Sequence, residues 1–91
     1  MGRIAAFMNL VVYMYTEANS PHHSPHCHVV CGGEKAVVSI PEGEVLAKSR
    51  NFPERELRAV QTWVYLRAGE LQADWDLAAQ GRQPLPIKPL I

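Results

Sequence analysis

The residues best suited to chemistry in this chain lie close together, between positions 22 and 31. This stretch holds all four histidines and both cysteines: His22, His23, His26, His28, Cys27 and Cys31. Imidazole nitrogens bind divalent metal ions, and they also take up and release protons near neutral pH. The stretch therefore suggests two kinds of site, a metal centre and a histidine-based acid–base site.

The spacing of His26 and His28 supports both hypotheses. On a β-strand the two side chains would share one face, with Cα atoms about 6.6 Å apart. Two imidazoles so placed can bind one divalent ion such as zinc, and the preceding loop could fold His22 or His23 over it as a third ligand. We expect His23, His26 and His28 as metal ligands and His26 and His28 as catalytic candidates. Because no Cys-x-x-Cys pair or His-Glu-x-x-His helix accompanies them, a metal-free histidine-rich loop stays open as an alternative.

The two cysteines are expected to be buried free thiols. On the same strand, Cys27 and Cys31 would point with Val29 to the face opposite His26 and His28. Their Cα atoms would be about 13 Å apart, whereas a disulfide needs less than roughly 7 Å. Free thiols are typical of a reducing compartment, so we expect a cytoplasmic protein.

Two periodicities predict the elements that position this cluster. Short β-branched and aromatic stretches divided by turns predict an antiparallel β-meander over residues 1–50, with a hairpin at Gly32 and Gly33. After Pro53, the spacing of Leu57, Val60 and Val64 predicts a helix that ends or kinks near Gly69, followed by a second helix. We expect one α+β domain over residues 1–91. Its two helices, over 53–81, would pack on one face of the sheet, and residues 82–91 would form an extended proline-rich tail.

Composition limits the partners. Nine basic residues balance nine acidic ones, which gives a net charge of zero. That balance argues against a broad phosphate-binding surface, so charge does not support a nucleic-acid partner. No stretch approaches the roughly 20 apolar residues that span a bilayer, so we expect no membrane association.

Several stretches together resemble one small bacterial family. They are Ile4 to Phe7, the strand around Tyr13, the element Pro25-His26-Cys27-His28-Val29, the strand from Lys35 to Ile40, the helix from Leu57 to Trp63, Trp75 to Gly81, and Ile87 to Leu90. The chain resembles the uncharacterised family labelled domain of unknown function 4160. The resemblance implies that Pro25, His26 and His28 match its most specific element, while Cys27 replaces a usual aromatic. The resemblance also implies that the gene for this chain lies beside a gene for a second small domain, and that the two form a toxin–antitoxin-like pair.

Two classes of function follow. The favoured one is an interaction module of such a pair, whose sheet edge or tail binds a protein from a neighbouring gene or a second copy of the chain. The alternative is a nuclease-type phosphodiester hydrolase. In it, His26 and His28 would bind metal or transfer protons, and Arg55 or Arg58 would neutralise phosphate. The zero net charge and the lack of an acidic residue in the histidine cluster count against the alternative.

Overall fold

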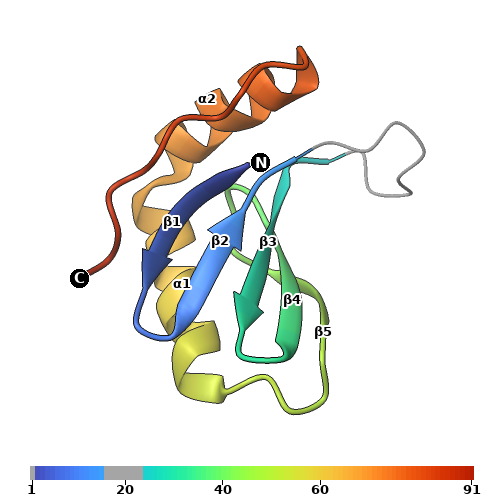
Figure 1. Ribbon diagram of the computed structural model, residues 1–91, viewed down its shortest axis with the longest axis vertical. Helices are drawn as coiled ribbons and strands as arrows, with labels where there is room; N and C mark the ends of the chain where they lie inside the picture. The colour runs from blue at the N-terminus through green and yellow to red at the C-terminus, as the bar shows by residue number, and fades with distance from the viewer. Residues whose placement is uncertain (1, 16–23) are drawn as a thin grey trace.

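The computed structural model describes residues 2–15 and 24–91 (Figure 1). Within them, five strands form one antiparallel sheet in chain order, and two helices follow. The elements are β1 (Arg3–Phe7), β2 (Leu10–Tyr13), β3 (His26–Cys31), β4 (Glu34–Ser39), β5 (Val45–Lys48), α1 (Glu54–Leu66) and α2 (Ala68–Ala79). This arrangement confirms the α+β meander predicted from the sequence.

The register of the sheet fixes which residues share a face. Cys31 pairs with Glu34 across Gly32 and Gly33, which confirms the predicted hairpin. Gly32 has a φ of 62°, a conformation that glycine adopts without steric cost. In one row, Val29 lies between Val12 and Ala36.

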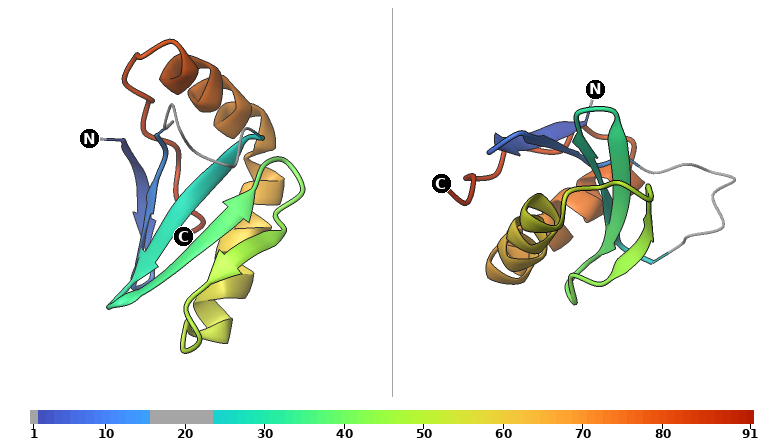
Figure 2. Two further views of the ribbon diagram at one scale, coloured as in Figure 1. Left: turned by 90° about the vertical axis from the view of Figure 1, so that its right-hand side faces the viewer. Right: turned by 90° about the horizontal axis from the view of Figure 1, so that it is seen from below.

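One face of the sheet supplies most of the core. Figure 1 places α1 behind the sheet, and both views of Figure 2 show α1 and α2 on that same side. The buried residues facing the helices alternate along β2, β3 and β4 and one residue beyond β2 and β4: Leu10, Val12, Met14, Cys27, Val29, Cys31, Ala36, Val38 and Ile40. The helices complete the core with Leu57, Val60, Trp63, Val64 and Leu71.

The boundary between the helices differs from the expectation. α1 ends at Leu66, and Gly69 lies exposed in the first turn of α2. Arg67 makes the break with φ −112° and ψ 23°, while its amide still donates to the carbonyl of Trp63 at 2.9 Å. The chain turns at Arg67, two residues before Gly69, so the break lies near the expected position but does not depend on the glycine. Neither helix in the described ranges has the length and apolarity to cross a membrane.

Residues 82–91 form neither helix nor strand, and they pack back on the molecule. In Figure 1 they run along α2 and then descend beside β1. The Leu85 amide donates to Oδ1 of Asp74 at 2.9 Å, and the Ile87 amide donates to the Ile4 carbonyl at 2.8 Å. Trp63 Nε1 donates to the Lys88 carbonyl, also at 2.8 Å. The tail is therefore part of the folded unit.

Candidate functional site: the open face of the sheet

The sheet face opposite α1 keeps apolar and aromatic side chains partly exposed. Pairing places Tyr13, His28, Val37 and Ala47 in one row across β2 to β5. A neighbouring row contains Val11, Val30 and Lys35. None of these side chains is buried among the described residues, in contrast to the other face.

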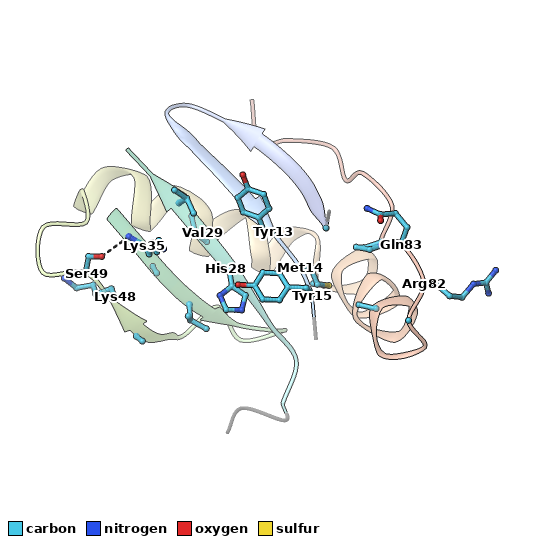
Figure 3. Close-up of a pocket in the computed structure, with 18 residues that line it drawn as sticks. Tyr13, Met14, Tyr15, His28, Val29, Lys35, Lys48, Ser49, Arg82 and Gln83 are labelled. Carbon is cyan, nitrogen blue, oxygen red and sulfur yellow. Dashed lines mark hydrogen bonds between the residues drawn. The ribbon is translucent and has the colours of Figure 1, made fainter. Parts of the chain in front are cut away.

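A hollow of about 1020 Å³ lies over this face (Figure 3). We call it the open-face groove. Among the described residues, its floor comes from β2 to β4 and from Tyr15 just beyond β2. Tyr13, His28, Val30 and Val37 contribute from the open face, and the buried core residues Met14, Val29 and Ala36 also border the hollow. One wall comes from the end of α2 and the start of the tail, at Ala78, Gly81, Arg82, Gln83 and Pro84.

The charged side chains that line the groove within residues 2–15 and 24–91 have one sign. Its described lining includes Lys35, Lys48 and Arg82 and no aspartate or glutamate. In Figure 3, Lys35 and Lys48 lie at one end with Ser49, and Arg82 lies at the other end with Gln83. The protein has zero net charge, yet this surface is locally cationic.

A buried carboxyl group holds the tail wall in place. Asp74 on α2 is only 3% exposed, and its Oδ1 accepts the Leu85 amide one residue beyond Pro84. Oδ2 is also buried and has no partner among the described residues. Desolvation raises the pKa of Asp74, Glu70 adds to the rise, and the hydrogen bond from Leu85 opposes it.

Four rings connect the groove floor to α2. Tyr15 stacks on His28, with centroids 4.4 Å apart and planes 7° from parallel. His28 meets the edge of His26 at 5.2 Å, and His26 packs on Trp75 at 5.0 Å. The series runs from an exposed tyrosine through a half-buried and then a buried histidine. Stacking of this kind fixes the position of the His28 imidazole in the groove.

The structure brings together two of the three predicted metal ligands. His26 and His28 share a face as parity predicts, but His26 is buried because Trp75 covers it. Nδ1 of His26 lies 2.8 Å from the Ser24 carbonyl, so Nδ1 carries the hydrogen and a metal would bind Nε2. His22 and His23 lie outside the described residues. No group of three metal-binding side chains occurs within residues 2–15 and 24–91.

Comparison with known families gives one match. The family model for a domain of unknown function, DUF4160, matches residues 9–76. The chain belongs to the DUF4160 family. The matched span runs from before β2 into α2 and includes the whole ring series from Tyr15 to Trp75, whereas Ile4 to Phe7 and Ile87 to Leu90 lie outside it. No curated protein and no solved structure matches the chain.

In this DUF4160 chain the predicted phosphate-neutralising arginines do not join the histidines. Arg55 and Arg58 are exposed on α1 and do not line the groove, and Arg58 Nε lies 3.7 Å from Glu54 Oε2. Lys35, Lys48 and Arg82 line it instead. The sequence could have predicted the position of Lys35. Lys35 and Val37 are two residues apart on β4, so their side chains lie on the same, open face of the sheet.

Both cysteines are free and buried on the helix-covered face, as the sequence predicted. Desolvation raises the pKa of Cys27 to about 12. Desolvation also raises the pKa of Cys31, and the charges of Glu56 and Glu34 add to the rise. These thiols therefore stay protonated at neutral pH and are unsuited to act as nucleophiles.

Proposed function

We propose that this chain is an interaction module that binds a polypeptide partner through the open-face groove. The observation that supports this function best is the groove of about 1020 Å³, which lies over the partly exposed row of apolar and aromatic residues on the sheet. That volume lies at the upper limit of small-molecule sites, which span roughly 300–1,000 Å³. The toxin–antitoxin-like gene pair implied by the family resemblance supports the product of a neighbouring gene as the partner, and a second copy of the chain is the other candidate.

The driving force is the removal of apolar surface from water. Val30 and Val37 are β-branched side chains that gain stabilisation on contact with apolar groups, at about 25 cal/mol per Å² buried. Their strands are held in place by pairing with neighbours on both sides. Binding to such a surface requires little ordering of the sheet, which favours affinity.

The test is co-expression with the product of the neighbouring gene, followed by size-exclusion chromatography. Wild type should co-elute with the partner, and Val37→Asp should not, because it places a charge in the apolar floor. Thr62→Asp is the matched control, since it adds the same charge at an exposed position of α1 outside the groove. A wild-type protein that elutes alone, or a Val37→Asp variant that still binds with a wild-type melting temperature, would count against the proposal.

A second function has one observation in its favour. His28 lines a groove with three cationic side chains and no described carboxylate, and the His26 ring lies 5.2 Å from it. The His28 imidazole could take the proton of an attacking hydroxyl while water protonates the leaving oxygen of a phosphodiester. His26 is buried and does not line the groove, so it would act by positioning the His28 ring. RNA and DNA cleavage by wild type, with loss in His28→Ala, would establish this function. A wild-type protein without cleavage would remove it.

Zinc or another divalent ion at His23, His26 and His28 belongs to the same proposal. Protein purified without a histidine tag should then contain close to one metal ion per chain by elemental analysis, and His26→Ala should abolish the metal content. Unchanged metal content in His26→Ala would refute these ligands.

A further inference from the structure

The open-face groove has an apolar and aromatic floor between two cationic ends, a pattern that constrains its occupant. Lys35 and Lys48 lie at the hairpin end, and Arg82 lies at the α2 end (Figure 3). We infer that the groove binds an amphipathic α-helix of the partner, with an apolar stripe against the floor and carboxylates toward both ends. This inference rests on the proposed function and names the kind of segment recognised.

The backbone of the occupant argues for a helix. Within the sheet, β3 is paired with β2 and β4, so its amides and carbonyls are already used in the ladder. A segment lying on the face of a sheet receives no main-chain hydrogen bonds from it. The occupant must satisfy its own backbone groups, and an α-helix does so internally. α1 covers the opposite face in this way.

A peptide can also bind to a sheet by adding a strand to its edge. At β1 the tail opposes this mode of binding. The Ile87 amide donates to the Ile4 carbonyl, so the tail already lies along the β1 edge. The open face has no such covering among residues 2–15 and 24–91, since its paired row stays partly exposed. The face is therefore a better docking surface than the β1 edge.

The charges argue for carboxylates on the helix. Lys35, Lys48 and Arg82 are all exposed, and the described lining offers them no acidic partner. Complementary charge across an interface mainly sets specificity and association rate, while like charges are strongly rejected. A basic helix with the same apolar stripe should therefore be excluded.

The wall that carries Arg82 is positioned before binding. Leu85 is held to the buried Asp74, and the intervening Pro84 is itself buried. Fixing the backbone in this way removes the ordering cost of the main chain near Arg82 at the moment of association. The exposed Arg82 side chain extends away from the groove in Figure 3 and must turn toward a bound carboxylate.

The experiment uses two synthetic helical peptides with the same leucine stripe, one with glutamates near both ends and one with lysines there. Amide chemical shifts of the full chain are followed during titration. The glutamate peptide should shift the groove residues around Tyr13, His28 and Val37, and bind at least about tenfold more tightly than the lysine peptide. The triple variant Lys35→Glu, Lys48→Glu and Arg82→Glu should reverse this preference.

The matched control is Arg50→Glu, Arg55→Glu and Arg58→Glu, which makes the same charge change at exposed positions that do not line the groove. It should retain the preference for the glutamate peptide. Equal binding of the two peptides, or no shifts in groove residues up to millimolar glutamate peptide, would overturn the inference. Tighter groove binding by a single-stranded oligonucleotide would also overturn it, because the occupant would then be nucleic acid.

The natural partner separates this inference from the proposed function. Suppose that Val37→Asp abolishes binding of the neighbouring gene product, and that the triple glutamate variant of Lys35, Lys48 and Arg82 binds it with unchanged affinity. The proposed interaction module is then supported, and the inference of an acidic helix is wrong. If neither variant changes that affinity, both are wrong.

Discussion

Val29 and Val30 are adjacent residues of β3 with identical side chains, yet they belong to different environments. Val29 is 0% exposed in the core between the sheet and the helices, although it also borders the groove, whereas Val30 stays partly exposed on the open face. The difference extends over the whole sheet, because one face is closed by α1, α2 and the tail, and the other lines a groove. The same β-branched residue thus contributes to folding on one face and is available for recognition on the other.

The largest expected effect comes from moving one charge across the sheet. Val29→Asp buries an unpaired carboxylate in the core and should cost more than about 4 kcal/mol of the free energy of unfolding. Val30→Asp places the same group on the open face and should cost about 1 kcal/mol or less. Urea denaturation of both variants measures the difference. Equal destabilisation would show that the two faces are not distinct.

A second pair of variants tests the closure of the covered face by the tail. Ile87 is 6% exposed and belongs to the core, while Leu85 is 62% exposed. Ile87→Ala should lower the free energy of unfolding by about 3 kcal/mol, because it leaves a cavity, and Leu85→Ala should change it by about 0.5 kcal/mol or less. A tail that served only a partner would give two equally small effects in the isolated protein.

The thiols probe the covered face at two positions. Cys27 is 0% exposed in the middle of the core, and Cys31 lies at the hairpin end of β3. Both should react with a thiol reagent at least about 100-fold more slowly in the native protein than in urea, which corresponds to an opening free energy of about 2.7 kcal/mol. Cys31 should react first, because strand ends open more readily. Rapid native labelling of both would mean that the strand faces are reversed.

Much of the fold follows from local rules that the sequence displays. Alternation predicted the faces of Cys27 and Val29, and the two glycines predicted the hairpin that aligns β3 with β4. The helical spacing of Leu57, Val60 and Val64 predicted the buried side of α1. Each of these features depends on neighbours within a few residues, so a single sequence contains the signal.

The features that the sequence did not predict depend on distant contacts. Burial of His26 needs Trp75, which lies 49 positions later, and the stacking of Tyr15 on His28 needs the register between β2 and β3. The composition of the tail predicts an absence of helix, but its return to β1 depends on Ile4, Trp63 and Asp74. Tertiary contacts of this kind leave no periodic pattern in the chain.

The smallest expected effect concerns Asp74, which holds the wall of the open face. Because desolvation raises its pKa, the native state binds this proton more tightly than the unfolded chain does. As pH rises from the ordinary aspartate range through the raised pKa, the native carboxylate must ionise in a buried site, so this group makes the protein less stable at higher pH. The usual effect of an ion-paired aspartate has the opposite sign.

Asp74→Asn removes the titration and retains an oxygen that can accept the Leu85 amide. The difference in unfolding free energy between Asp74→Asn and wild type should therefore grow in favour of the variant as pH rises through that window, and then level off. Amide exchange at Leu85 should follow the same trend in wild type, since loosening of the wall exposes it. Asp76→Asn is the control on the same helix, because Asp76 is exposed and its Oδ1 bonds to Gln72. If the wild type instead gains stability relative to Asp74→Asn as pH rises, then the ionised form of Asp74 stabilises the tail wall. Desolvation would then not be the dominant effect on this carboxyl group, and the prediction would be wrong.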